Sequence, residues 1–202
     1  GPRSLLHRTD VGRLRVKAWQ LEQAGQPVAA HAALGEALVA AEKSHWPQGP
    51  LLLERVRVAT RSAPPGELAA ALEQDRQKLF VTAPLWYERI PSATPSVPPK
   101  LDEAQTRRRA EALASMSRLE EGLALLDTLP EVTAAKKQRV RARLLYRAKA
   151  YARAAPALAE AAGVPKLLDT PPSLGGRALD DDELEDAFHA ARARSRGGDD
   201  AA

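Results

Sequence analysis

The sequence predicts an all-α fold in which helical hairpins stack as a solenoid, or superhelix, with a proline-rich interruption. The first observation behind this is a seven-residue pattern that recurs at a fixed spacing within residues 102–162. The second is the composition, which is 44% hydrophobic with only 4% aromatic residues and much alanine. Alanine has the highest helix propensity. Self-similarity of helical pairs at a fixed period is typical of helical-repeat folds.

The two copies of the pattern lie 32 positions apart, residue for residue. The first comprises Ala110, Leu113, Met116, Leu119, Gly122, Leu126 and Leu129, and the second comprises Ala142, Leu145, Ala148, Tyr151, Ala154, Leu158 and Ala161. A third copy lies upstream and comprises Ala18, Leu21, Ala24, Pro27, Ala30, Leu34 and Ala37. Because one such hairpin has a thin core, we expect neighbouring repeats to complete the burial.

Residues 9–80 are expected to form the N-terminal helical hairpins. Residues 1–8 are expected to be a flexible start, because the opening Gly-Pro-Arg-Ser resembles the remnant of a protease-cleavage site. Thr9 or Asp10 can cap a first helix, and Gly25 supplies the left-handed residue that ends it. Pro27 then suits the first turn of a second helix.

Two further helices, over residues 51–60 and 67–80, fit the 32-residue register poorly and indicate a degenerate repeat. Residues 81–101 are rich in proline, which a long helix cannot cross, so we expect an insertion or a linker there. Trp86 and Tyr87 lie within it. They are either anchors for a peptide or sugar or packing residues that hold the insertion on the helices. Trp19 and Tyr146 are expected to pack.

Residues 102–163 are predicted to hold the two best repeats, opened by a capping box of Asp102 and Gln105. Residues 164–196 are expected to form a loop and a terminal helix, with a second cap signature at Asp180 and Glu183. Leu184, Phe188 and Ala191 share one face of that helix. Residues 197–202 are expected to be a disordered tail.

Bulk properties exclude some functions. The chain has no cysteine, so it forms neither disulfides nor thiolate metal sites. Its net charge of +4 does not by itself favour nucleic-acid binding. No apolar run approaches the roughly 18 residues of a membrane helix, so we expect no membrane insertion. No serine-hydrolase elbow, phosphate-binding loop or dinucleotide fingerprint is present, so we expect neither catalysis nor a cofactor.

Charged residues supply the candidate binding surface. Arg139, Arg143 and Arg147 follow one helix stripe, and we expect Arg107 and Glu111 to join them on the inner face formed by the first helix of each pair. Such a stripe suits an acidic protein segment, an anionic glycan or phosphates. The alternative is an outer face paired with the acidic cluster at residues 180–186. His31 is expected to form hydrogen bonds rather than bind a metal.

Several segments resemble tetratricopeptide helices, notably residues 24–30, 109–113 and 126–130. The order of features over Leu68 to Ala162 is similar to the superhelical region that precedes the catalytic domain of soluble lytic transglycosylases. This resemblance implies a bacterial cell-envelope or periplasmic protein that handles peptidoglycan or positions partners. The family's catalytic Glu-Ser dipeptide is absent from this chain, so its activity is not carried over to any residue.

The function we predict is a non-catalytic scaffold that presents a concave, partly basic surface to a protein or peptide segment. The candidate contacts are Arg107, Glu111, Arg139, Arg143, Arg147, Trp86 and Tyr87. Two alternatives remain: the superhelical module of a peptidoglycan lytic transglycosylase, and a module that binds nucleic acid or acidic glycan. Steep salt dependence of binding would indicate the last of these.

Overall fold

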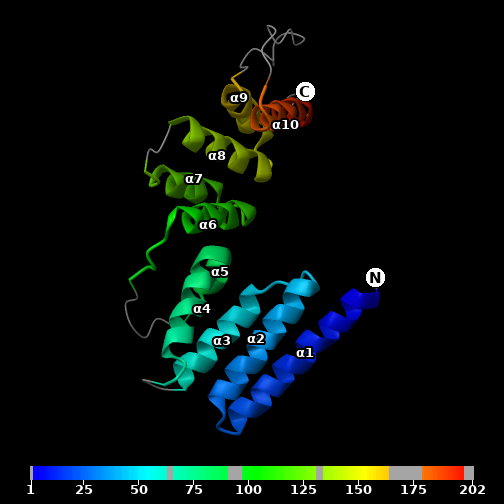
Figure 1. The fold of residues 1–202 in the computed structure, drawn as a ribbon, viewed down its shortest axis with the longest axis vertical. Coiled ribbons are helices and arrows are strands. Elements are labelled where there is room, and N and C mark those ends of the chain that lie inside the picture. Colours follow the sequence, from blue (N-terminus) through cyan, green and yellow to red (C-terminus); the bar gives the residue numbers. More distant parts are fainter. Residues whose placement is uncertain (1, 63–65, 91–96, 131–133, 164–178, 198–202) are drawn as a thin grey trace. The chain divides into compact units, whose positions relative to one another are not determined.

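The computed structural model describes residues 2–62, 66–90, 97–130, 134–163 and 179–197. Within these ranges the regular secondary structure is α-helical and no strand occurs, which confirms the all-α prediction (Figure 1). The helices are α1 (Pro2–Gln23), α2 (Pro27–Lys43), α3 (Gly49–Arg61), α4 (Ala69–Thr82), α5 (Pro84–Tyr87), α6 (Glu103–Ser115), α7 (Leu119–Asp127), α8 (Ala134–Arg147), α9 (Tyr151–Ala161) and α10 (Asp181–Gly197).

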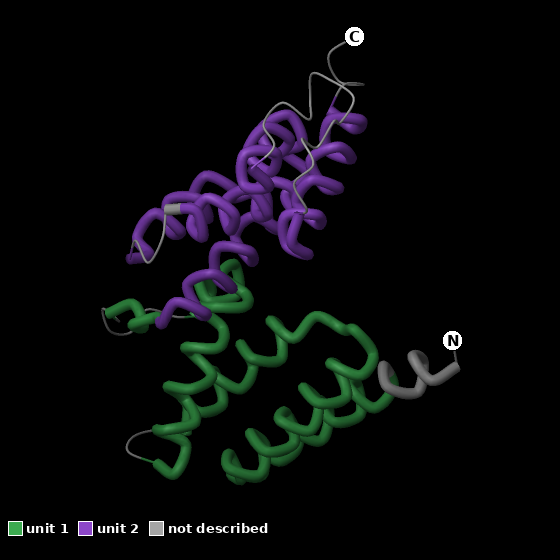
Figure 2. Tube along the Cα trace, turned by 45° about the horizontal axis from the view of Figure 1, so that its top comes forward, with its two compact units in different colours: residues 1–101 green, residues 102–202 purple. Residues whose placement is uncertain are grey.

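The chain divides into two compact units, Gly1–Leu101 and Asp102–Ala202, shown in separate colours in Figure 2. The break therefore falls at the end of the proline-rich segment. In unit 1, α1 pairs with α2, α2 packs on α3, and α3 packs on α4. In unit 2, α6 pairs with α7 and α8 with α9, while α10 packs mainly on α9. Consecutive helices thus pack as neighbours within each unit.

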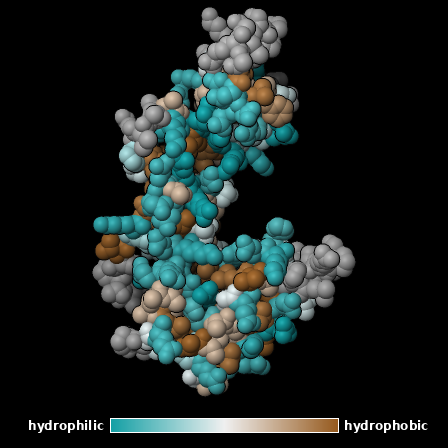
Figure 3. Space-filling model, in the orientation of Figure 1, coloured by the Kyte–Doolittle hydropathy of each residue, from teal (hydrophilic) through white to brown (hydrophobic). Residues whose placement is uncertain are grey.

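Unit 1 is built around an aliphatic core. Leu34, Leu51, Leu52, Val56 and Leu79 are among its fully buried side chains, and small residues of α2 let α1 and α3 approach from either side. Helix α4 ends at Thr82 because Pro84 follows and cannot continue its hydrogen bonding. Hydrophobic residues also reach the surface in patches among hydrophilic ones over the helices of this unit (Figure 3).

The two repeats of unit 2 have matching cores. At every one of the seven paired positions from 110/142 to 129/161, both residues are buried or both are half-buried. Of the four positions that are buried in both repeats, three are also buried in the upstream copy, where Ala18, Ala30 and Leu34 occupy them. The 32-residue spacing therefore corresponds to equivalent places in successive hairpins, as the pattern predicted.

The turns within the hairpins repeat as well. Gly25, Ser117 and Lys149 each end the first helix of a hairpin with a positive φ, of 73°, 63° and 61°. The next backbone N–H donates to a carbonyl five residues back, as Gln26 to Leu21, Arg118 to Leu113 and Ala150 to Leu145, at 2.9, 3.0 and 3.0 Å. This is the Schellman motif. Only the first turn uses the glycine that this conformation favours.

Both predicted caps are present. The Gln105 N–H donates to Asp102 Oδ1 at 2.8 Å, and the Asp102 N–H donates to Gln105 Oε1 at 3.1 Å. Asp180 and Glu183 form the same reciprocal pair ahead of α10, at 2.7 and 3.1 Å. These bonds satisfy backbone donors that a helix start leaves unpaired, which fixes where α6 and α10 begin.

The structure corrects two boundaries. Helix α1 begins at Pro2, so Thr9 and Asp10 lie inside it and do not cap it, and residues 2–8 belong to a helix rather than to a flexible start. Gly197 ends α10 rather than opening a tail. The rest of the expected tail, most of the expected loop (164–178) and part of the insertion (91–96) lie outside the described residues.

Helix α10 packs through a face other than the apolar one noted in its sequence. Leu184 and Phe188 are 59% and 61% exposed, and Ala191 is exposed too. The buried residues are Ala190, Ala193 and the carboxylate of Asp186. The helix is therefore oriented by small residues and by an ion-paired acid.

Candidate functional site

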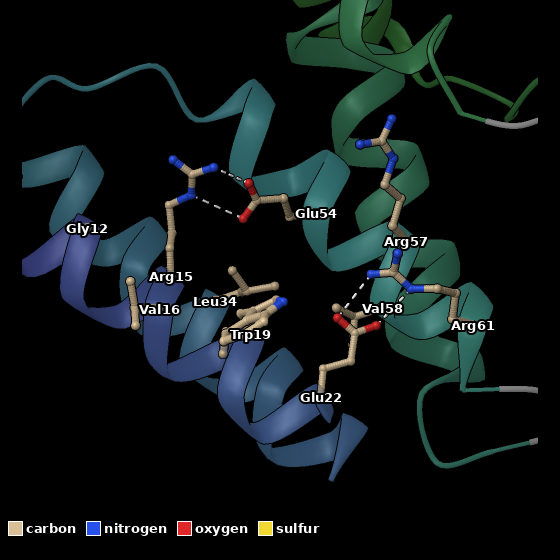
Figure 4. Close-up of a pocket in the computed structure, with 11 residues that line it drawn as sticks. Gly12, Arg15, Val16, Trp19, Glu22, Leu34, Glu54, Arg57, Val58 and Arg61 are labelled. Carbon is tan, nitrogen blue, oxygen red and sulfur yellow. Dashed lines mark hydrogen bonds and ion pairs between the residues drawn. The ribbon is translucent and has the colours of Figure 1, made fainter. Parts of the chain in front are cut away.

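A groove of about 590 Å³ runs between α1 and α3 on unit 1 (Figure 4). These are the first helices of the first two hairpins, and α2 lies behind them. Leu34 of α2 and Val58 of α3, both buried, contribute apolar lining. Val16 and Trp19 of α1 line the groove and remain largely exposed. Its volume lies in the range of pockets that hold drug-sized ligands.

Two ion pairs bridge the groove from α1 to α3. Arg15 donates to Glu54, with its Nε 3.2 Å from Oε2, and this hydrogen bond is the main reason that the pKa of Arg15 is raised above its ordinary value. Arg61 Nε lies 2.7 Å from Glu22 Oε1, and Nη2 donates to Oε2 at 3.0 Å. The two bridging residues of α1 are seven positions apart, as are the two of α3, so the bridges are separated by about 10 Å along the helices.

Trp19 lies between the two bridges, as Figure 4 shows, and is 61% exposed. The expectation that Trp19 is a packing residue is therefore wrong. The buried stripe of α1 runs through Val11, Leu14 and Ala18, and Trp19 is one position beyond it. The missed signal is that Trp19 shares a stripe with Arg15 and Glu22, two charged residues, rather than with the apolar ones.

Arg57 is the remaining charged residue that lines the groove. Its side chain is exposed and has no ion-pair or hydrogen-bond partner among the residues that the structure describes. Since the other two arginines of the groove are paired with two glutamates, the lining carries one net positive charge, and that charge is at Arg57.

In unit 2, four of the predicted contact residues meet at a smaller groove of about 170 Å³ between α6 and α8. They are Arg107, Glu111, Arg143 and Arg147. Arg147 donates to Glu111 across this groove at 2.5 Å, and Arg107 donates to Glu103 on its own helix. Lys136 Nζ of α8 lies 3.7 Å from the same Glu103. These four residues thus share one groove, as expected of a common surface, but their charges are largely paired within the unit.

Arg139 and Arg143 bind the acidic residues of α10. Arg143 Nε donates to Asp186 Oδ1 at 2.8 Å and its Nη2 to Asp182 Oδ1 at 3.2 Å. Burial opposes the charge of Arg143, but these hydrogen bonds outweigh it, so the pKa of Arg143 is raised. Arg139 Nε lies 2.7 Å from Asp186 Oδ2 without aiming its N–H at that oxygen, so this contact is an ion pair only.

The pairing of the basic stripe with the C-terminal acidic cluster was part of one alternative left by the sequence. The contacts show this pairing for Arg139 and Arg143, whereas Arg147 pairs with Glu111 instead. They also give no support to the anion-binding alternative, because a phosphate would have to displace carboxylates that are already in place. The burial of Asp186, which is 0% exposed, was not predicted.

Trp86 and Tyr87 pack against the core of unit 1. A Cβ placed on Gly49 would lie 2.3 Å from Trp86 Cδ1, so the indole is seated directly on that glycine, and Arg89 lies over the ring at 4.5 Å. Tyr87 meets Phe80 edge to face, with ring centroids 4.8 Å apart. Trp86 and Tyr87 are thus packing residues in the structure, and their role as anchors for a partner stays a prediction.

One buried polar cluster joins three helices of unit 1. His31 Nε2 of α2 lies 2.8 Å from Asp75 Oδ2 of α4, and Arg55 Nε of α3 lies 3.2 Å from the same oxygen. Because a carboxylate only accepts, His31 donates to Asp75 through Nε2, and the guanidinium of Arg55 lies against the ring, with Nε 3.2 Å from Nε2 and Nη2 3.4 Å from Nδ1. His31 and Asp75 are each 5% exposed, so the cluster holds helices together rather than meeting a ligand. The hydrogen-bonding role predicted for His31 is confirmed.

No family model, curated protein or solved structure matches the chain. The likeness to tetratricopeptide proteins and to soluble lytic transglycosylases therefore stays an expectation from the sequence. Across the described ranges there is no group of three or more potential metal ligands. None of the helices described has the length and hydropathy of a membrane span.

Proposed function

We propose that this chain is a non-catalytic helical-repeat scaffold that binds a segment of another protein. In this proposal each unit is a short, tetratricopeptide-like stack of hairpins, and the first helices of consecutive hairpins form its recognition side. The matched burial of the repeats and their shared turn geometry support this arrangement. Both grooves described above lie between such first helices, α1 with α3 and α6 with α8.

The observation that carries the proposal is the exposed indole of Trp19 inside the larger groove. Tryptophan is among the residues most enriched at the energetic centres of protein interfaces. Trp19 stands over apolar lining and between charged residues that can form a polar rim, an arrangement typical of binding sites. Arg107, Glu111, Arg143 and Arg147 remain candidate contacts through the smaller groove of unit 2.

A photo-crosslinking experiment tests the proposal. Val16 and Val39 are similarly exposed, at 56% and 53%, but only Val16 lines the groove. A photoreactive phenylalanine analogue is introduced at each position, and the protein is irradiated in an extract of the cells that produce it. We expect one defined protein segment, identified by mass spectrometry, to couple at position 16 and not at position 39. That segment, purified, should bind the unsubstituted chain. Identical products at both positions, or none at position 16, would contradict a docking role for the groove.

A further inference from the structure

The geometry of the groove restricts what can enter it. The bridges Arg15–Glu54 and Glu22–Arg61 cross from α1 to α3 about 10 Å apart. A whole helix is 10–12 Å wide with its side chains, so it cannot fit between them down to the groove floor. One or two side chains of a peptide can. The shape therefore favours insertion of side chains from a short segment that crosses the bridges.

The lining between the bridges is apolar. The ring of Trp19 stands there with Leu34 and Val58, whose side chains are almost fully buried, and Val16 lies one turn away on α1. Burial of apolar surface is the main favourable term available at such a place. An aromatic side chain would add the geometric preference of paired rings, stacked or edge to face. The inserted residue is thus expected to be bulky and apolar.

The charge of the groove selects the neighbours of that residue. Glu22 and Glu54 are already bound to arginines, so a cationic segment finds no free carboxylate, while Arg57 is exposed and has no partner in the described part of the chain. An acidic side chain beside the apolar one can pair with Arg57. Unit 2 contains the same chemistry, because Arg139 and Arg143 of α8 hold the carboxylates of α10.

We infer that the groove between α1 and α3 binds a short acidic–apolar segment of a partner protein, with a bulky apolar side chain against Trp19 and a carboxylate against Arg57. The inference rests on the proposed scaffold function and specifies the chemistry of its partner. The apolar contact supplies most of the affinity, and the carboxylate selects anionic over cationic segments, as complementary charge does at interfaces.

The test uses three synthetic peptides with blocked ends, each fluorescently labelled and titrated with the full chain. Their sequences are Glu-Glu-Leu-Phe-Glu-Glu, Lys-Lys-Leu-Phe-Lys-Lys and Glu-Glu-Ala-Ala-Glu-Glu. We expect binding of the first and much weaker binding of the other two. Trp19→Ala should weaken the first peptide by about thirtyfold, the loss typical of an interface centre. Trp19 is mostly exposed, so circular dichroism should show an unchanged fold.

The predicted contact between Arg57 and a carboxylate of the peptide is tested with a matched control variant. Arg57→Glu should weaken the acidic peptide by about tenfold and improve binding of the lysine peptide. Arg108→Glu makes the same change in net charge at an exposed arginine of α6 that has no described partner, and it should alter neither titration. Equal binding of the acidic and lysine peptides, or equal effects of the two arginine substitutions, would overturn the inference.

Two other outcomes would also overturn the inference, and they distinguish its failure from the failure of the proposed scaffold function. If none of the peptides binds while a protein segment still couples at position 16, the scaffold function holds and the acidic–apolar chemistry is wrong. If sedimentation shows self-association that Trp19→Ala abolishes, the occupant of the groove is a second copy of this chain.

Discussion

Replacing the buried carboxylate of Asp186 by an amide should weaken the attachment of α10 to α8 and so destabilise unit 2. Asp186 is fully buried and lies within 2.8 Å of Arg143 Nε and 2.7 Å of Arg139 Nε. Asparagine keeps the size of the side chain but removes its charge, and its NH₂ group would face a guanidinium donor. Removing one partner of a buried ion pair costs about 3–5 kcal/mol when the other charge stays buried.

Here the cost should be somewhat smaller. The side chains of Arg139 and Arg143 keep 27% and 33% of their exposure, so both can recover part of their hydration once Asp186 is neutral. We therefore expect Asp186→Asn to lower the free energy of unfolding of unit 2 by about 2–3 kcal/mol. For a unit of this size, that loss lowers the melting temperature by roughly 10–20 °C.

The distribution of aromatic residues makes this measurable. All three tryptophans, Trp19, Trp46 and Trp86, lie in unit 1, so tryptophan fluorescence follows unfolding of that unit, whereas circular dichroism follows both. In urea, Asp186→Asn should shift part of the circular dichroism transition and leave the fluorescence transition unchanged. Asp181→Asn is the control: it removes an exposed charge in the first turn of the same helix and should cost at most about 1 kcal/mol. Equal losses for the two variants would refute the role assigned to Asp186.

Three further predictions concern the repeats. Gly122→Ala should lower the free energy of unfolding by at least about 1 kcal/mol, because the added Cβ would lie 2.7 Å from the backbone oxygen of Ala110. Gly12→Ala should raise it by up to about 1 kcal/mol, because a Cβ there has nothing within 4 Å and alanine favours a helix more than glycine does. Chemical denaturation of the two variants measures the loss and the gain. Lys149→Gly should raise the melting temperature, because residue 149 has a φ of 61° and glycine adopts this angle without strain. The expected gain in the free energy of unfolding is about 0.5–1 kcal/mol. An unchanged or lower melting temperature would count against the turn geometry. Hydrogen bonds from Arg153 and Arg118 are the main cause that lowers the pKa values of Glu120 and Glu121. The unfolded state therefore binds more protons than the folded state as the pH falls. The stability that the two carboxylates contribute is thus present above pH ~4.5 and is lost as the pH falls below it. Replacing both by glutamine should flatten this acid limb in denaturation curves recorded from pH 3 to 7, and an equally steep limb would exclude the two groups as its cause.

The hairpins could be predicted because their signals are local and periodic. The register from Ala110 to Ala142 reports which positions face a neighbouring helix, and the reciprocal caps at Asp102 and Asp180 require only residues three positions apart. The left-handed turn at Gly25 has a glycine to mark it. Ser117 and Lys149 lie inside the two copies of the pattern, and their residue types do not mark a left-handed turn.

The groove and the buried acids could not be predicted in the same way. A hydrophobic pattern assigns Trp19 to the core because it neighbours Ala18, yet one position rotates a side chain by about 100° around the helix. Asp75 and Asp186 are buried because arginines from other helices reach them. The pairs Arg55–Asp75 and Arg143–Asp186 are 20 and 43 positions apart in the sequence, and such distant pairing leaves no periodic signal. Similarly, the exposure of Phe188 follows from the acid that orients α10.

The docking role of the groove is tested most directly by the three indole N–H signals in an NMR spectrum of the chain. Each tryptophan gives one signal, and substitution by phenylalanine assigns it. On addition of the acidic–apolar peptide, we predict that the signal of Trp19 shifts while those of Trp46 and Trp86 stay in place. Binding of the peptide without a shift at Trp19, or equal shifts of all three signals, would contradict the proposal that partners dock between α1 and α3.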